Sequence, residues 1–228
     1  MTGAQTLLVL GAGTLVGLDL ASVPQAMFSR PLVAGLLGGA AVGAPLPGLA
    51  VGALLELFAL DTLPIGATRN PDWGPGTVAV GALAGAHTGG ILASGLLGLV
   101  VVAVLSAWLG GWLTHLVRRA NVTAVEAERA ALEAGEAAAV SRLQRSGLVR
   151  DAVRGFALTA LALGGGDVVS TLFARRWGGP QVIAQVALAA TSIGVGLHAG
   201  ARLAGRGRAL WLFGGLCAGA LSAVLWLR

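Results

Sequence analysis

The sequence predicts an all-α fold: a polytopic bundle of glycine-rich membrane helices, some of them broken or re-entrant. Of its 228 residues, 56% are hydrophobic and only 11% are charged, and the mean hydropathy is +0.83. Soluble domains carry about 25% charged residues, so this chain has too few polar side chains to cover a water-soluble globule. Because about 20 apolar residues span a bilayer as a helix, residues 1–228 are predicted to form one membrane domain with about seven or eight apolar segments.

The charged residues predict an orientation in the membrane and argue against nucleic-acid binding. The formal net charge is +5, the chain has no Lys, and seven of its fifteen Arg lie between Arg118 and Arg154. Cytoplasmic loops of membrane proteins are enriched in Arg and Lys, so we expect residues 115–154 to face the cytoplasm. The single cysteine, Cys217, allows no intrachain disulfide, and three scattered histidines predict no metal site and no cofactor.

The first apolar stretch covers residues 5–21. No basic region precedes it, so it is predicted to be a membrane segment and not a cleaved signal peptide. Its glycines at positions 11, 13 and 17 are similar in spacing to a dinucleotide-binding fingerprint, but no βαβ unit follows them. We therefore interpret it as a glycine-rich membrane helix, followed by a polar turn over residues 22–30.

Two short apolar arms predict a re-entrant hairpin. Residues 32–44 and 48–60 are separated by Pro45-Leu46-Pro47, and each arm has 13 residues. At 1.5 Å per residue an arm reaches about 20 Å, less than a hydrocarbon core of about 30 Å. The alternative is one long tilted helix with a kink at Pro47.

Polar and apolar segments alternate through the rest of the chain. Residues 61–75 contain three prolines and cannot form a continuous helix. Residues 115–154 are rich in Ala, Glu and Arg and predict an amphipathic cytoplasmic helix, on which Arg129 and Glu133 have the i,i+4 spacing of an ion pair. The predicted apolar segments of this part are residues 76–86, 91–112, 156–173, 182–201 and 209–227.

Glycine spacing predicts close contacts between helices. Gly35, Gly39 and Gly43 are four residues apart, as are the glycines at positions 81, 85 and 89. Small residues at this spacing let two helix backbones approach closely in lipid. The pattern therefore predicts tight helix packing rather than a particular dimer.

A run of three glycines predicts a second broken helix. Gly164 to Gly166 stand before Asp167 in the middle of an apolar segment. Paired interruptions in the two halves of a chain point to transporter binding sites and inverted repeats. The hairpin prolines with Glu56 would form the first interruption, and the triple glycine with Asp167 the second. Asp167 is therefore a candidate binding residue.

Other candidate site residues are Glu56, Asp61, Asn70, Asp72 and Trp73. Glu56 stands in an apolar run, where a charge at the bilayer centre costs about 2.5–3.5 kcal/mol on insertion scales. Carboxylates and amides hydrogen-bond to hydroxyls, and an indole ring can stack on the apolar face of a sugar, so the set suits a neutral, hydroxyl-rich ligand. The sequence contains no Ser-His-Asp set, phosphate-binding loop or nucleophilic cysteine context, so the chain is not expected to be an enzyme.

Each of these residues also has a structural alternative. Glu56 can be protonated or paired with an arginine. Asp61 can end a helix at the membrane interface, and Asp72 can cap the segment after Pro71. Trp73 can anchor the chain at the interface. At the level of the sequence these alternatives stay open.

The region FSRPLVAGLLGG, followed by GLAVGALLELFALDTLPIGATRNPD, resembles the enzyme IIC subunit of the mannose/fructose/sorbose class of bacterial sugar phosphotransferase systems. The resemblance covers most of the chain and is strongest in residues 25–85. The matching positions are Phe28, Arg30-Pro31-Leu32, Gly48, Gly52, Glu56, Ala59-Leu60, Ile65-Gly66-Ala67 and Pro71-Asp72.

The resemblance implies a transport function. Such a subunit lies in the bacterial inner membrane with a IID subunit, in a larger oligomer of IIC–IID pairs. It carries a hexose across the membrane for phosphorylation by soluble IIA and IIB proteins, by an elevator-like movement of one domain past a scaffold. The resemblance further implies a sugar site shared with IID, with Glu56 as its foremost candidate and the loop 65–72, including Gly66 and Ala67, lining it.

The sequence also departs from the family pattern. Asp61 and Thr62 stand where the family more often has glycine and an aromatic residue, Thr68-Arg69-Asn70 is more polar than usual, and the C-terminal part is shorter. These departures leave a second hypothesis, a degenerate membrane scaffold or regulatory relative that no longer transports sugar.

Overall fold

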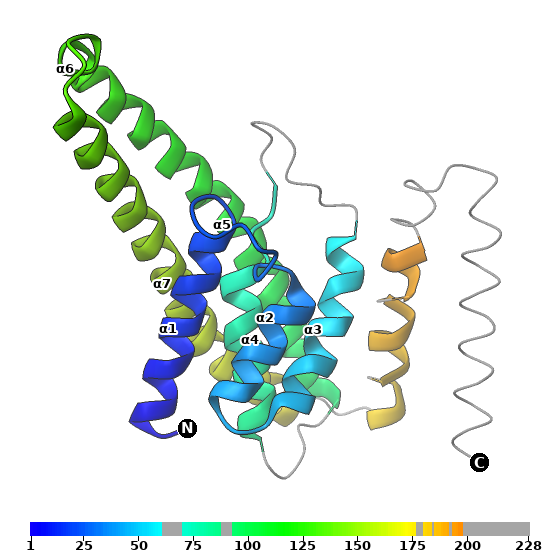
Figure 1. Cartoon of the computed structure of the whole chain (residues 1–228). Coiled ribbons are helices and arrows are strands. Elements are labelled where there is room, and N and C mark those ends of the chain that lie inside the picture. The colour runs from blue at the N-terminus through cyan, green and yellow to red at the C-terminus, as the bar shows by residue number, and fades with distance from the viewer. Residues whose placement is uncertain (61–69, 88–92, 177–179, 184, 192, 198–228) are drawn as a thin grey trace.

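The structure, a computed structural model, describes residues 1–60, 70–87, 93–176 and 180–197 except 184 and 192. Within these residues every regular element is a helix, which confirms the predicted all-α fold. The labelled helices are α1 (Gly3–Asp19), α2 (Pro31–Ala41), α3 (Pro45–Ala59), α4 (Gly74–Ala86), α5 (Ala93–Ala127), α6 (Arg129–Glu133) and α7 (Ala137–Arg176). A further apolar helix covers Gln181–Leu197 (Figure 1). The segment predicted at 209–227 lies outside the described residues.

Helix α1 begins with a reciprocal cap. The Thr2 hydroxyl accepts a hydrogen bond from the Gln5 backbone N–H at 3.2 Å, and the Gln5 side chain accepts one from the Thr2 N–H at 2.8 Å. This arrangement satisfies donors that the first turn of a helix leaves without partners. The Gln5 amide also donates to the Val42 carbonyl at 3.2 Å, which ties the start of α1 to the turn between α2 and α3.

Helices α2 and α3 form the predicted hairpin, so the alternative prediction of a single kinked helix is wrong. The chain reverses at Val42 to Ala44, where Gly43 has φ +83°, and not at Pro45-Leu46-Pro47 as predicted. Pro45 instead occupies the first turn of α3, where its fixed φ suits a helix and its missing N–H needs no partner. With 11 residues, α2 rises about 16 Å, short of the hydrocarbon core, which fits a hairpin that enters and leaves by one face.

Glycines form the contact between the two arms. A Cβ on Gly35 would lie 2.5 Å from the Gly48 carbonyl oxygen, and a Cβ on Gly52 would lie 2.5 Å from the Pro31 carbonyl oxygen. Gly81 of α4 meets Gly35 in the same way, at 2.6 Å from its carbonyl oxygen. The predicted role of glycine spacing is therefore confirmed for these positions. Gly43 is an exception, because it lies in the turn and has no neighbour within 4 Å of an added Cβ.

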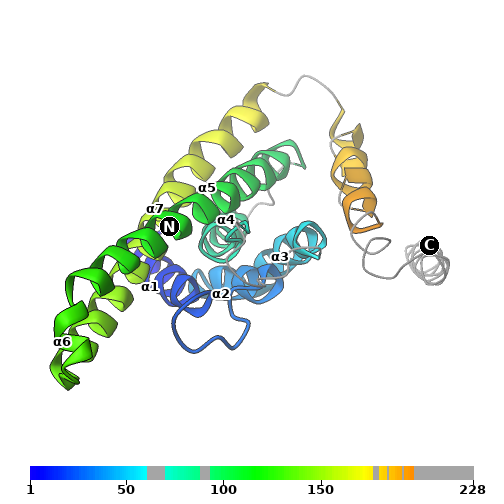
Figure 2. The same cartoon turned by 90° about the horizontal axis from the view of Figure 1, so that it is seen from above.

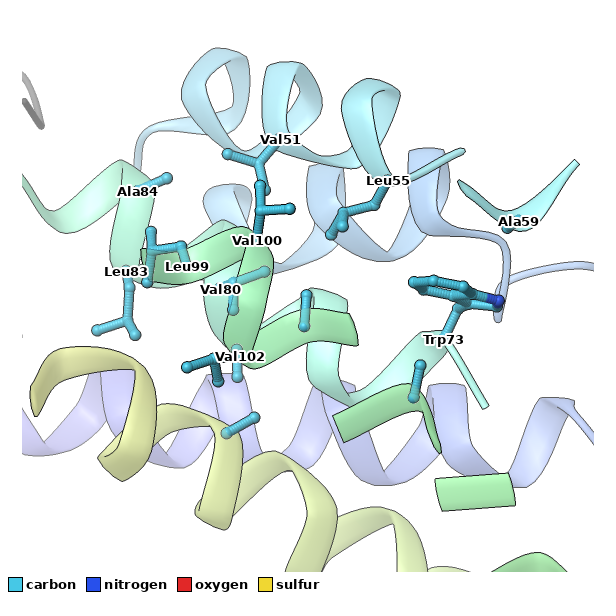
Figure 3. Packing of buried hydrophobic residues seen from close by; sticks show 14 of the residues in the cluster. Val51, Leu55, Ala59, Trp73, Val80, Leu83, Ala84, Leu99, Val100 and Val102 are labelled. Carbon is cyan, nitrogen blue, oxygen red and sulfur yellow. The ribbon is translucent and has the colours of Figure 1, made fainter. Parts of the chain in front are cut away.

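Helix α4 is the centre of the fold. Every residue from Gly74 to Gly85 is buried, and α4 contacts α1, α2, α3, α5 and α7. Figure 2 shows it between the α2–α3 hairpin and the α5–α7 pair. A helix that is apolar on all sides belongs in the interior of a protein. Its Val80 and Leu83 pack with Leu55 of α3 and Leu99 of α5 in the main hydrophobic cluster (Figure 3).

Residues 115–154 do not form one helix, contrary to the prediction, although α7 does lead from this region into the next predicted span. Helix α5 continues without interruption from the predicted span to Ala127, α6 forms the tip, and α7 returns beside α5 (Figure 1). We call the part of α5, α6 and α7 that extends beyond the other helices, residues 115–150, the arm. Arg142 of α7 pairs with Glu128 at 2.8 Å, and its hydrogen bond lowers the pKa of the Glu128 carboxyl below its usual value.

Helix α7 also contradicts the predicted break at Gly164 to Gly166. It is continuous from Ala137 to Arg176, and Asp167 is exposed on its surface. A Cβ on Gly166 would lie 2.6 Å from Leu83 Cδ1, so this glycine permits close packing on α4 instead of interrupting the helix. The second of the two paired interruptions is therefore absent, and an internal inverted repeat stays a prediction.

Two helices of the described residues are long and apolar enough to cross a membrane by length and composition. They are Ser94–Ala127 in α5 and Ala137–Arg176 in α7. Large apolar side chains lie exposed on the outside of the bundle. They include Leu105 and Trp108 on α5 and Val168 and Leu172 on α7. Lipid can cover such side chains, whereas a soluble monomer rarely exposes large apolar patches.

The glycine contact between α2 and α3 predicts a position-dependent effect of adding one methyl group. We expect Gly35→Ala to lower the melting temperature of the detergent-solubilised protein, because overpacking a tight contact costs about 1–3 kcal/mol. Gly11→Ala is the matched control, since no atom lies within 4 Å of its added Cβ and alanine favours a helix. Equal melting temperatures for the two variants would contradict the packing assigned to Gly35.

Candidate functional site

A polar cavity of about 590 Å³ lies where the arm joins the bundle. Its volume falls within the roughly 300–1,000 Å³ of small-molecule sites. The loop after α1, the segment before α4, and facing parts of α5 and α7 enclose it. Its polar and charged lining residues are Ser22, Gln25, Ser29, Arg30, Asn70, Thr114, His115, Arg118, Asn121, Gln144, Arg150 and Asp151.

The loop after α1 is held in place by a buried carboxylate. Asp19, only 2% exposed, accepts hydrogen bonds from the backbone N–H of Ala26 at 2.6 Å and of Ser29 at 3.0 Å. Gln25 and Met27 have φ of 58° and 65°, a left-handed conformation that residues other than glycine seldom adopt. Asp19 was not among the predicted site residues, although it determines how the loop faces the cavity.

The segment before α4 lies directly on the glycines of α5. A Cβ on Gly110 would lie 2.8 Å from Asp72 Cβ, and the Asp72 N–H donates to the Ala107 carbonyl at 2.8 Å. This close approach brings Asn70 and Trp73 to the cavity wall. Trp73 is only 9% exposed and packs against the Phe58 ring at 6.4 Å between centroids, so it is not an interface anchor.

A buried ion cluster lies behind this segment. Arg154 of α7 pairs with Asp72, donates to the Gly17 carbonyl at 2.7 Å, and donates to Asp151 at 3.3 Å. Asp151 in turn accepts a hydrogen bond from the Ser22 hydroxyl. The cluster therefore joins α7 to the end of α1, to the loop and to the segment before α4. Trp73 holds the N-cap position of α4 without a side-chain cap hydrogen bond, and the Asp72 carboxylate lies beside the Gly74 N–H of the first turn.

Arg154 and Asp151 were not predicted from the sequence to lie at the candidate site. Both were counted only as part of the Arg-rich region that indicates orientation. Their i,i+3 spacing at the start of an apolar segment was the available signal, because charges that enter a membrane are expected to be paired. Asp72, the partner of Arg154, is 82 positions away in the chain, so the sequence could not identify it.

Glu56 fits its structural alternative, a pair with an arginine. Its Oε1 accepts from Arg30 Nε at 2.8 Å, and its Oε2 accepts from the Leu32 N–H at 3.0 Å. The carboxylate thus lies at the N-terminus of α2, where the helix dipole favours negative charge. Glu56 does not line the cavity, but its partner Arg30 does, so the pair lies at the edge of the cavity.

The structure brings together only part of the predicted site. Asn70 and Trp73 line the cavity, while Asp72 lies behind it and Glu56 beside it. Asp167 is exposed on α7 and does not line it. The predicted residues Asp61, Gly66 and Ala67 lie outside the described residues. In the part of the chain that the structure describes, no three His, Cys, Asp or Glu side chains gather in a group that could hold a metal ion.

The lining can bind a neutral polar solute by many hydrogen bonds. Amides such as Gln25 and Asn70 both donate and accept, hydroxyls such as Ser29 do the same, and guanidinium groups donate only. The Trp73 ring adds an apolar surface. This mixture of groups fits a ligand that carries several hydroxyl groups and also has an apolar face.

Comparisons with known proteins agree with a membrane transporter fold. The model of the EII-Sor family, described as the PTS system sorbose-specific IIC component, matches residues 4–194. No curated protein matches the chain. A solved structure described as that of a membrane protein matches with a TM-score of 0.72, and a cryoEM structure of the mannose transporter ManYZ with microcin E492 (MceA) matches with 0.63. Both are 23% identical, covering 100% of this chain and 96% of the other.

The buried cluster predicts a large loss of stability when its arginine is removed. Arg154→Met leaves the carboxylates of Asp72 and Asp151 without their cation, and breaking a buried pair from one side costs about 3–5 kcal/mol. Arg142→Met is the control on the same helix, because its pair with Glu128 lies at the surface, with side chains 48% and 30% exposed, and surface pairs contribute little. Melting of the purified proteins in detergent tests this. Similar melting temperatures for the two variants would rule out a central role for the cluster.

Proposed function

Because the chain belongs to the EII-Sor family of phosphotransferase-system sorbose-specific IIC components, we propose that it carries a hexose of the mannose/fructose/sorbose type across the bacterial inner membrane. Components of this family serve transport, and the fold is that of a membrane protein. The chain itself is not the phosphoryl-transfer enzyme. Soluble IIA and IIB proteins phosphorylate the sugar that it delivers.

The cavity at the base of the arm carries the proposal. It is lined by Asn70 and Trp73, which belong to the region where the sequence most resembles the IIC family. Asn70 offers an amide, and Ser29 and Gln25 of the facing lining offer further donors and acceptors. Glu56 orients Arg30 toward the same space. We therefore propose that the sugar binds in this cavity, and Asp61, Gly66 and Ala67 stay predicted site residues.

A IID-like membrane subunit is the expected partner. The mannose transporter ManYZ, whose structure has the same fold, supports a second membrane component in this kind of assembly. The exposed apolar side chains of α5 and α7 offer a surface that such a subunit can cover. Several IIC–IID pairs then form the complete transporter.

The arm faces the cytoplasm in this proposal. It carries Arg118, Arg119, Arg142 and Arg145, and Arg-rich segments beside membrane spans stay on the cytoplasmic side. The cavity then opens at the cytoplasmic end of the bundle, where IIB reaches the sugar.

Uptake measurements test the sugar site. In vesicles that contain the chain, its IID-like partner and IIA/IIB, we expect Asn70→Ala to reduce phosphorylation-dependent hexose uptake at least about tenfold. A buried hydrogen bond left without its partner costs roughly 1–3 kcal/mol, which corresponds to this loss of affinity. Asp167→Asn is the control, because Asp167 is exposed and outside the cavity.

Unchanged uptake by Asn70→Ala would refute the assignment of this residue. Absence of uptake by the unsubstituted assembly, for mannose, fructose and sorbose alike, would favour the second hypothesis of a non-transporting scaffold.

Cysteine labelling tests the orientation. In a Cys217→Ser background, Glu133→Cys at the tip of the arm should react with an impermeant maleimide in inside-out vesicles. Thr2→Cys, before α1 at the opposite end of the bundle (Figure 1), should react in right-side-out vesicles. Labelling of position 133 only from the periplasmic side would contradict the proposed orientation.

A further inference from the structure

The wall of the cavity that α5 and α7 build is basic. Arg118 and Arg150 line it, with the polar side chain of Asn121 between them in the lining. The proposed sugar-binding residues Asn70 and Trp73 come from a different segment of the same cavity. The cavity therefore combines a neutral polar region with a cationic one.

Two further charged groups of the lining, Arg30 and Asp151, have charged partners. Arg30 pairs with Glu56, with 2.8 Å between Nε and Oε1. Asp151 accepts from Arg154 at 3.3 Å. Because Arg154 also pairs with Asp72, one guanidinium faces two carboxylates, and Asp151 keeps part of its negative charge at the cavity. Among the residues that the structure describes, Arg150 forms no ion pair, so its positive charge is not cancelled in the same way.

Arg150 is held by neutral groups. Its Nη1 donates to Asn121 Oδ1 at 2.8 Å and lies 3.4 Å from the Ser146 hydroxyl oxygen. These contacts orient the guanidinium without neutralising it. A guanidinium carries five N–H donors, and within the described ranges neither its Nε nor its Nη2 has a hydrogen-bond partner. The side chain is half-buried, so its attraction for an anion is screened less than that of a fully exposed arginine.

We infer that this basic wall binds the phosphoryl group of a phosphorylated sugar. A planar guanidinium matches the oxygens of a phosphate and donates two parallel hydrogen bonds to them. The inference rests on the proposed function, in which the sugar becomes a phosphate ester at this end of the bundle. A cavity of about 590 Å³ holds the sugar ring near Asn70 and Trp73 and its phosphoryl group at Arg150. The cavity is then the place where the product is held before release.

Binding measurements on the full-length chain, purified with any membrane partner that accompanies it, test the inference. The ligands are mannose, mannose 6-phosphate and inorganic phosphate, titrated by calorimetry into nanodiscs of phosphatidylcholine. We expect mannose 6-phosphate to bind at least about tenfold more tightly than mannose, because charge-assisted hydrogen bonds are worth roughly 1.4 kcal/mol or more. Inorganic phosphate should compete with it.

Arginine variants of α7 locate the effect. Arg150→Gln should remove the preference, so that the variant binds mannose 6-phosphate and mannose with affinities within about twofold of each other. Arg150→Lys, which keeps the charge without the planar fork, should retain part of the preference. Arg145→Gln is the matched control, because Arg145 is exposed on the same helix and does not line the cavity. The melting temperature of each variant shows whether it is folded.

Three results would overturn the inference. In the first, the unsubstituted protein binds mannose 6-phosphate no better than mannose. In the second, Arg150→Gln keeps the same preference as Arg145→Gln. In the third, adding phosphatidylglycerol to the nanodiscs blocks mannose 6-phosphate through Arg150, which would assign this wall to a lipid headgroup.

Failure of the proposed function has a different signature. If the sugar site is wrong, mannose does not bind to any variant, but inorganic phosphate still binds to the unsubstituted protein and not to Arg150→Gln. That result would retain an Arg150-dependent phosphate site and remove the transported sugar from its interpretation.

Discussion

The burial of α4 on every side is the constraint on which the rest of the structure depends. Five helices contact it, so its place determines how the others are spaced around it. This is possible because α4 carries mainly Gly, Ala and Val, and Gly81 meets the backbone of α2 at Gly35. In lipid, where apolar surface is not driven together by water, such close van der Waals packing holds helices in contact.

The ion cluster around Arg154 fixes the end of α4 that faces the cavity. Packing of small residues sets the distance between two helices. A buried, directional hydrogen bond additionally opposes the sliding of one helix along the other. Arg154 supplies such bonds to Asp72 before α4 and to the Gly17 carbonyl of α1, and Asp151 holds the loop through Ser22. Buried charges are costly unless they are paired, and here one guanidinium serves two carboxylates, while Asp72 Oδ1 has no hydrogen-bond partner among the described residues. The residues that join these elements also position the walls of the cavity.

The cavity and the arm are parts of one arrangement. Because α5 and α7 extend beyond the other helices, their facing sides enclose space next to the loop after α1. One part of that space has the amides, hydroxyls and indole that suit a sugar. Another part has Arg150, oriented by Asn121. The proposed transport of a sugar that becomes phosphorylated would use both kinds of surface in one cavity.

The amino-acid sequence by itself determined the membrane class, the α2–α3 hairpin, the glycine contacts and the family, because composition and local spacing carry these properties. Only the tertiary structure decided which charges meet. Asp72 and Arg154 pair across 82 positions, and Glu56 meets Arg30 instead of the cavity. The predicted break at Gly164–Gly166 was wrong because packing of Gly166 on α4 keeps α7 continuous. A triple glycine weakens a helix locally, but long-range contacts that no local pattern contains determine whether the helix breaks.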